Sequence, residues 1–352
     1  MKLHKASRLA KALLPLVTAF AVTAFGASGS YDGGQPTNPK DLKGKKIVLA
    51  DVPKLIGIGY FAATTKGQAE AAAELTKKGL PTEVTTDAPT EAAIQKQIEF
   101  IDNAISRGVD GILFASNDPV AISPVLRKAL KAGIRVVGYD AESQPDAREW
   151  FVQQATPEGI AKALIDSMVA EVGKEADIAI VTSSLTAPNQ NAWIAEMKKY
   201  IAAEGLKLNI VTILPSEEDQ QLAFKATGQI VKAYPNVKGI IGLSSVAFPG
   251  AADAITQANL IGKIAVTGLS TPNQMKPFVK SGCVKSVVLW NPVDLGYAAI
   301  YVMRAVVDGK LKPGDTEVDA GRLGKLKVIN NSQFLLGPPF IFNKDNIDKF
   351  DF

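Results

Sequence analysis

Two charged side chains follow predicted strands and could hold a polar ligand. Lys54 comes shortly after the apolar run 47–50, and Asp140 comes directly after the run 134–139. Ligands of open α/β sheets bind at the carboxyl ends of the strands, so both side chains are candidates for a binding site. An ammonium group can donate to several hydroxyl oxygens and a carboxylate can accept from several, in charge-assisted bonds. A surface lysine and a helix-capping aspartate are the alternatives.

Four residues further along the chain are also candidates for contacting a polar ligand. Asn189 and Gln190 each offer a donor and an acceptor. A helix is expected to begin just beyond them, so helix capping is an alternative role for Asn189. Pro249 and Ala251 could contribute only backbone carbonyls and shape, and the start of a helix explains them equally well.

Aromatic side chains near these positions could pack against an apolar face of a ligand. Phe61 and Trp290 are our candidates for lining a cleft, ahead of Tyr60 and Trp193. Burial in the core is the alternative for all four.

The sequence is poor in groups for nucleophilic or metal chemistry. Its one histidine, His4, lies in a segment that we expect to be removed, and its one cysteine is Cys283. This excludes Ser–His and Cys–His pairs and the commonest zinc ligands from the remaining chain, so we expect no metal and no cofactor. Cys283 adjoins an apolar run and is interpreted as a small buried residue.

Residues 1–29 have the pattern of a secretory signal peptide. A basic start is followed by an apolar run over 13–25 and by small residues at 26–29. The run is shorter than the roughly 20 apolar residues that a membrane span needs, so we expect a cleaved, periplasmic protein. The chain has 39 basic and 35 acidic residues, and the signal peptide carries only basic ones. The near-neutral remainder argues against nucleic-acid binding.

Short apolar runs alternate with longer segments of helical period along the rest of the chain, as in parallel sheets covered on both faces. The expected helices are 66–78, 91–106, 120–132 and 295–307, with others centred near Leu164, Met197, Gly228 and Ala254. The expected strands are 47–50, 82–86, 111–115, 134–139, 150–152, 178–181, 208–213, 239–242, 264–266, 287–290, 326–328 and 334–336.

This alternation predicts an α/β fold of two doubly wound, parallel-sheet lobes joined by a hinge that the chain crosses several times. We assign 46–142 and 272–315 to an N-terminal lobe. We assign 143–271 and 316–352 to a C-terminal lobe.

Several segments together resemble the type I periplasmic solute-binding proteins of ABC sugar importers. The resemblance covers the whole chain after the signal peptide and is strongest to the branch that contains the autoinducer-2 and rhamnose-binding proteins. It is carried by the segments 53–61, 138–140, 189–193, 268–272, 289–292 and 342–347. It implies a monomeric two-lobed clamp that binds a small neutral sugar-like ligand, such as rhamnose or autoinducer-2, and delivers it to an ABC permease.

The resemblance also implies particular ligand-binding residues. Proteins of the autoinducer-2 type hold their ligand with a lysine, an aspartate, an Asp–Gln pair, a proline and an alanine. The matching positions are Lys54, Asp140, Asn189, Gln190, Pro249 and Ala251, where only Asn189 departs from the pattern. Segments 189–193 and 289–296 are closer to the rhamnose type and 248–251 to the autoinducer type, so the motifs disagree on the ligand.

The sequence leaves three alternative functions to consider. A sugar-modifying enzyme could use carboxylates such as Asp140, Glu142 and Asp294, although the resemblance is to proteins without enzymatic activity. A transcription regulator with the same core would carry a helix-turn-helix where this chain has its signal peptide. A sensory or chemotaxis accessory protein that presents its ligand to a receptor fits the sequence equally well.

Overall fold

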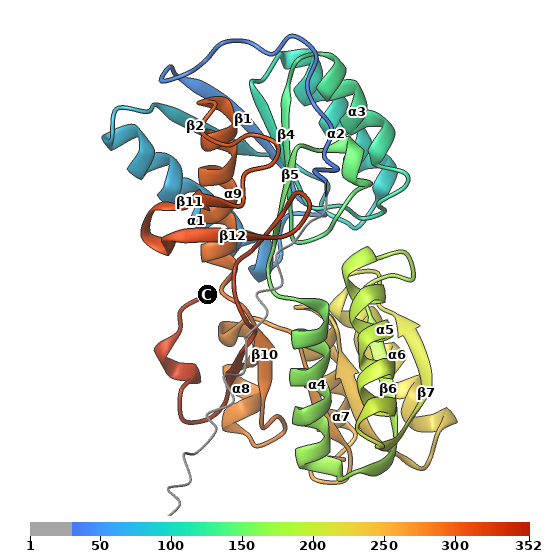
Figure 1. The fold of residues 1–352 in the computed structure, drawn as a ribbon. Helices are drawn as coiled ribbons and strands as arrows, with labels where there is room; N and C mark the ends of the chain where they lie inside the picture. Colours follow the sequence, from blue (N-terminus) through green and yellow to red (C-terminus); the bar gives the residue numbers. More distant parts are fainter. Residues whose placement is uncertain (1–29) are drawn as a thin grey trace, which may run out of the picture.

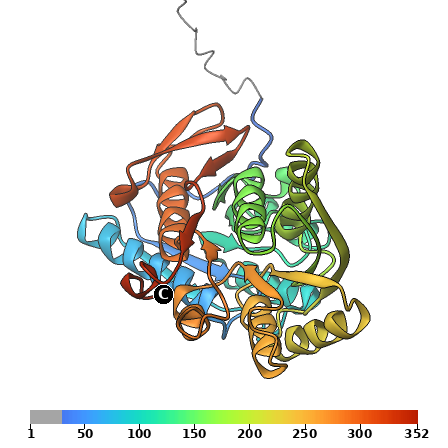
Figure 2. The same ribbon diagram turned by 90° about the horizontal axis from the view of Figure 1, so that it is seen from below.

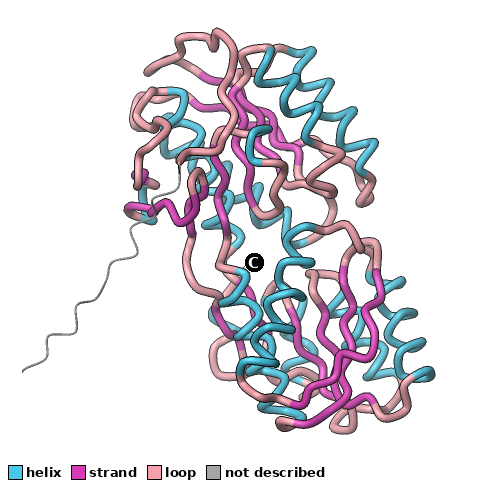
Figure 3. The backbone as a smooth tube through the Cα atoms, turned by 45° about the vertical axis from the view of Figure 1, so that its right-hand side comes forward, coloured by secondary structure: helices cyan, strands magenta, loops and turns pink. Residues whose placement is uncertain are grey.

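The structure is a computed structural model that describes residues 30–352, so the expected signal peptide lies outside the described residues. The chain forms two lobes, one above the other in Figure 1. In both lobes strands make up the middle layer and helices cover its two sides (Figure 3). Among the residues described, no helix is long and apolar enough to cross a bilayer.

The first lobe is built on an eight-stranded sheet with the order β11-β12-β13-β5-β4-β3-β1-β2. Strands β13 through β2 in this order are parallel, and β11 and β12 continue the sheet in antiparallel fashion. The strands are β1 (Ile47–Val52), β2 (Thr82–Thr86), β3 (Gly111–Phe114), β4 (Arg135–Tyr139), β5 (Trp150–Gln153), β11 (Glu317–Asp319), β12 (Lys325–Asn330) and β13 (Gln333–Leu335). The helices are α1 (Gly59–Lys77), α2 (Ile94–Arg107), α3 (Ser123–Lys131) and α9 (Pro292–Val307).

The second lobe contains a parallel sheet with the order β7-β6-β8-β9. A bridge between Leu269 and Val288 continues it to β10, which pairs with β14 in antiparallel fashion. The strands are β6 (Glu175–Thr182), β7 (Lys207–Pro215), β8 (Val237–Gly242), β9 (Ala265–Gly268), β10 (Val287–Leu289) and β14 (Phe340–Phe342). The helices are α4 (Pro157–Val172), α5 (Pro188–Ala203), α6 (Gln220–Ala233), α7 (Ala247–Gln257) and α8 (Pro272–Lys280). The C-terminus lies beside α8 (Figure 2). The Asn273 amide at the start of this helix donates to the Phe352 carbonyl (3.0 Å).

Helix α9 is central to the first lobe because its residues are almost all buried. It crosses α1 at close range. A Cβ atom on Gly67 of α1 would collide with the Val293 carbonyl, and one on Gly296 of α9 would collide with the Thr64 carbonyl. Only glycine at these two positions allows the helix backbones to approach so closely.

The chain passes between the lobes three times, so the expected multi-crossing hinge is confirmed. The crossings join β5 to α4, β10 to α9 and β13 to β14. Three connections close together restrict the relative motion of the lobes mainly to opening and closing.

Strand pairing corrects the expected lobe boundaries in three places. Strand β5 belongs to the first lobe, because it pairs with β4 and β13. Strands β11 to β13 also join the first-lobe sheet, although we assigned 316–352 to the second lobe. Helix α8 and strand β10, which we placed in the first lobe, pack with α7 and β9 of the second. The apolar runs located β5, β10, β12 and β13 correctly, but a run of apolar residues does not identify its pairing partner.

Candidate functional site

A cavity opens between the two lobes and brings together most of the predicted site residues. Lys54, Phe61, Asp140, Asn189, Gln190 and Trp290 all line it. The space between the lining atoms, including the part open to solvent, is about 370 Å³. The other lining residues are Ile58, Tyr60, Trp193, Glu218, Leu243, Ser244, Ser245, Leu269 and Leu289.

Lys54 is held in place by hydrogen bonds to the backbone around it. The side chain of Gln97, which is fully buried on α2, donates to the carbonyls of Val52 (3.2 Å) and Pro53 (3.1 Å). The Asn117 amide group donates to the carbonyl of Lys54 itself (2.9 Å). The loop after β1 is therefore fixed, and its lysine, only 3% exposed, lines the cavity.

The amide pair at the start of α5 approaches from the second lobe. Lys54 Nζ donates to Asn189 Oδ1 (3.3 Å), so a hydrogen bond already links the lobes. The Gln190 side-chain carbonyl accepts from the Thr182 hydroxyl (2.6 Å) and from the Ser183 amide (2.7 Å). Because this oxygen is engaged by its own lobe, Gln190 has its amide nitrogen left to donate to a ligand.

Asp140 has an unusual backbone conformation. Its φ is +61°, and the Ala141 amide donates to the Tyr139 carbonyl (2.6 Å), which makes a tight three-residue turn. Backbone strain of this kind is concentrated at functional sites. Burial raises the pKa of the Asp140 carboxyl, while Lys54 and a hydrogen bond from Tyr60 oppose the rise.

A hydrogen-bonded relay joins Asp140 to the aromatic wall of the cavity. Trp290 Nε1 donates to the Tyr60 hydroxyl (2.8 Å), which in turn donates to Asp140 Oδ1 (2.8 Å). The Trp290 ring makes edge contacts with Tyr60 and Trp193, at centroid separations of 6.1 and 5.8 Å. Tyr60 and Trp193, which we ranked below Phe61 and Trp290, thus line the cavity with them. Aromatic faces of this kind can support the apolar face of a sugar ring.

Pro249 and Ala251 are not among the residues that line the cavity. Both are buried within the first turns of α7, which begins at Ala247. The loop before the helix reaches the cavity instead, through Ser244 and Ser245. Gly250, which lies between them, packs against α6, where a Cβ atom would collide with the Gln220 carbonyl.

Glu218 is a lining residue that the sequence reasoning missed. It follows β7, and its Oε2 atom is buried without a hydrogen-bond partner among the described residues. Burial raises the pKa of the Glu218 carboxyl. Lys54 and the nearby hydroxyls of Ser244 and Ser183 lower this pKa, and Asp140 raises it. Both Glu217 and Glu218 have positive φ values, +52° and +54°.

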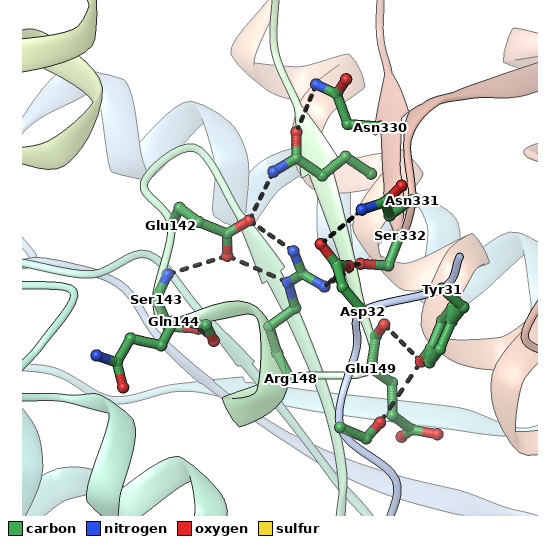
Figure 4. A network of polar contacts seen from close by, with 12 residues as sticks. Tyr31, Asp32, Glu142, Ser143, Gln144, Arg148, Glu149, Asn330, Asn331 and Ser332 are labelled. Carbon is green, nitrogen blue, oxygen red and sulfur yellow. Dashed lines mark hydrogen bonds and ion pairs between the residues drawn. The ribbon is translucent and has the colours of Figure 1, made fainter. Parts of the chain in front are cut away.

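The other two carboxylates considered for glycoside chemistry are engaged outside the cavity. Glu142 pairs with the fully buried Arg148 (2.8 Å) in a network that ties the loop after β4 to the N-terminal segment and to β13 (Figure 4). Asp294 pairs with Arg322 (2.8 Å). Neither lines the cavity with Asp140, so no pair of these three carboxylates flanks a common ligand position.

The described residues contain no cluster of three or more potential metal ligands. Cys283 is buried, and burial raises the pKa of its thiol. It lies away from the interlobe cavity, against Thr256 and Ala252 of the second lobe, as expected for a small buried residue.

Comparison with known proteins identifies the family. Residues 50–311 match the family described as "Periplasmic binding protein domain". The chain belongs to this family. It is also similar to the D-allose-binding periplasmic protein of Escherichia coli, with 26% identity over 68% of this chain and 82% of that protein.

Solved structures of the family have the same two-lobed architecture. An ABC transporter solute-binding protein from Clostridium phytofermentas with bound L-rhamnose is 30% identical, covers 87% of this chain and 98% of its own, and has a TM-score of 0.79. LsrB from Clostridium saccharobutylicum in complex with AI-2 is 26% identical to this chain, with a TM-score of 0.81. The match covers 87% of this chain and 100% of LsrB. This chain is therefore a type I periplasmic binding protein. It is related to sugar-binding proteins of ABC importers and is not an enzyme.

Proposed function

We propose that this protein binds one small, neutral, polyhydroxylated ligand in the interlobe cavity and delivers it to an ABC permease in the inner membrane. The observation that carries the proposal is the meeting of Lys54, Asp140 and Gln190, from both lobes, beside an aromatic wall. These groups match the alternating hydroxyl and C–H surfaces of a sugar.

The comparisons support a sugar but leave its identity open. The relatives bind D-allose, L-rhamnose and AI-2, which differ in ring size and in the positions of their hydroxyl groups. A 6-deoxyhexose such as rhamnose and the furanosyl tetrol form of AI-2 are the ligands that we propose first. We also propose that the protein acts as a periplasmic monomer with no affinity for nucleic acid.

A thermal-shift screen of the purified protein tests this function. The panel contains L-rhamnose, AI-2, D-allose, D-ribose and D-fucose, with sugar phosphates and amino acids as competing classes. We expect at least one neutral compound to stabilise the protein by mass action, by about 2.7 kcal/mol when its concentration is 100 times its Kd. Stabilisation by sugar phosphates or amino acids alone would refute the proposal.

A further inference from the structure

Among the residues that line the cavity, acidic side chains outnumber basic ones. One lysine, Lys54, faces two carboxylates, Asp140 on the first lobe and Glu218 on the second. Asp140 accepts a hydrogen bond from Tyr60. Glu218 Oε2 is buried and makes no hydrogen bond in the described part of the chain, although the hydroxyls of Ser183 and Ser244 lie close enough to lower the pKa of the carboxyl. A buried acceptor without a partner is unfavourable, and a donor on a bound ligand would satisfy it.

The backbone around Glu218 is fixed in a conformation that residues with a Cβ rarely adopt. Glu217 and Glu218 are consecutive left-handed residues. The Glu217 amide donates to the Ser183 carbonyl (2.6 Å), and Asp219 caps α6 by accepting from the Leu222 amide (2.7 Å). The segment is thus held on both sides, with Glu217 exposed and Glu218 lining the cavity. Strain of this kind is expected where a side chain must be placed for function.

We propose that Glu218 is a specificity-determining residue of the cleft. Its carboxylate accepts a hydrogen bond from a ligand hydroxyl on the second-lobe side, opposite Asp140, and repels ligands that carry a negative charge there. The cleft thereby selects neutral sugars over the corresponding sugar acids. This inference rests on the proposed function, because it assumes that the interlobe cavity is the sugar site.

The substitution Glu218→Gln keeps the size of the side chain and removes its charge, and Glu217→Gln is the matched control. The control residue is adjacent and has the same backbone conformation, but its side chain points to solvent. Calorimetric titrations would use L-rhamnose, D-allose, D-ribose, D-fucose and D-galacturonate. D-Fucose and D-galacturonate share a ring configuration and differ at C6, where one has a methyl group and the other a carboxylate.

We expect Glu218→Gln to weaken binding of the preferred neutral sugar about five- to tenfold, because a charge-assisted hydrogen bond becomes a neutral one. We also expect preference for D-fucose over D-galacturonate to fall at least tenfold. Glu217→Gln should bind like the parent protein. The neutral-sugar titration decides by itself: equal affinities of Glu218→Gln and the parent would overturn the inference while leaving the proposed function intact. If the parent binds none of these sugars, the proposed function fails and the inference fails with it.

Discussion

At the scale of single residues, Asp140 combines three features of a ligand-binding group. It is 4% exposed, its φ is +61°, and its carboxylate is oriented by Tyr60. Asn tolerates a left-handed backbone and can still accept from Tyr60. We therefore expect Asp140→Asn to change the melting temperature by only a few degrees. It should weaken binding of the preferred sugar by roughly 10- to 100-fold, because a charged acceptor is replaced partly by a donor.

Isothermal titration of Asp140→Asn and of the exposed control Asp345→Asn measures this effect. The control should match the parent protein. If Asp140→Asn also matches it, Asp140 does not contact the ligand and the cleft has been assigned wrongly.

The cavity residues that could be predicted are those that match the family pattern or follow the end of a strand. Lys54, Asp140 and Gln190 follow β1, β4 and β6, and all three line the cavity. Glu218 obeys the same rule, but the strand before it was expected to end at 213, and an acidic pair next to Asp219 is typical of an exposed loop. The orientation of Glu218 depends on two left-handed residues, a conformation that the sequence alone does not reveal.

At the scale of elements, the relay from Trp290 through Tyr60 to Asp140 connects β10, α1 and β4. The hydrogen bond from Tyr60 lowers the pKa of the Asp140 carboxyl and so opposes the effect of burial. We expect Tyr60→Phe to raise the pKa of Asp140 further and to leave Trp290 Nε1 without its acceptor. Affinity for the preferred sugar should fall about three- to tenfold at neutral pH.

The pH dependence of sugar affinity distinguishes an effect of Tyr60 on the pKa of Asp140 from the loss of a contact between Tyr60 and the sugar. Because ligand hydroxyls need the ionised carboxylate as acceptor, affinity should decline as the pH falls. In Tyr60→Phe this decline should begin at a higher pH than in the parent protein. Titrations from pH 5 to 8 measure the shift, with Tyr200→Phe as the control, because the Tyr200 hydroxyl bonds Lys162 and Asp166 of α4 and does not line the cavity. Identical pH profiles for Tyr60→Phe and the parent would contradict the relay.

Some helices and strands, and some strand pairings, could not be predicted from the sequence. The strand near Trp150 was expected to open the second lobe, because the alternation of strands and helices restarts there. It instead pairs with β4, in the register Val137↔Trp150, and completes the first-lobe sheet before the chain crosses the hinge. The short strands β11 and β14 and the helix α8 were not predicted at all, since each is brief and depends on its partners.

At the scale of the whole molecule, the buried carboxyl of Asp51 should make stability depend on pH. It is fully buried at the end of β1 and accepts from Tyr139 (2.9 Å) and Thr86 (3.1 Å). Burial raises its pKa from 3.8 to about 6. A carboxyl whose pKa is raised in the folded state contributes stability below its unfolded pKa, and this contribution disappears as the pH rises through the folded pKa.

Asp51→Asn cannot ionise and should not lose this contribution. Between pH 4 and pH 7.5, the stability of the variant relative to the parent should therefore increase, by on the order of 2 to 3 kcal/mol. Thermal unfolding of both proteins across this range, with the exposed control Asp345→Asn, measures the change. A constant difference between Asp51→Asn and the parent would show that Asp51 is not ionised with a raised pKa in the folded protein.

The crystal structure of the protein with the sugar that stabilises it most would test the central claim directly. We predict one sugar ring between the lobes, with hydroxyl groups hydrogen-bonded to Lys54, Asp140 and Gln190 and with its C–H face against the aromatic wall of the cavity. A sugar bound elsewhere, or bound between the lobes without contact to Lys54 and Asp140, would contradict the proposed site.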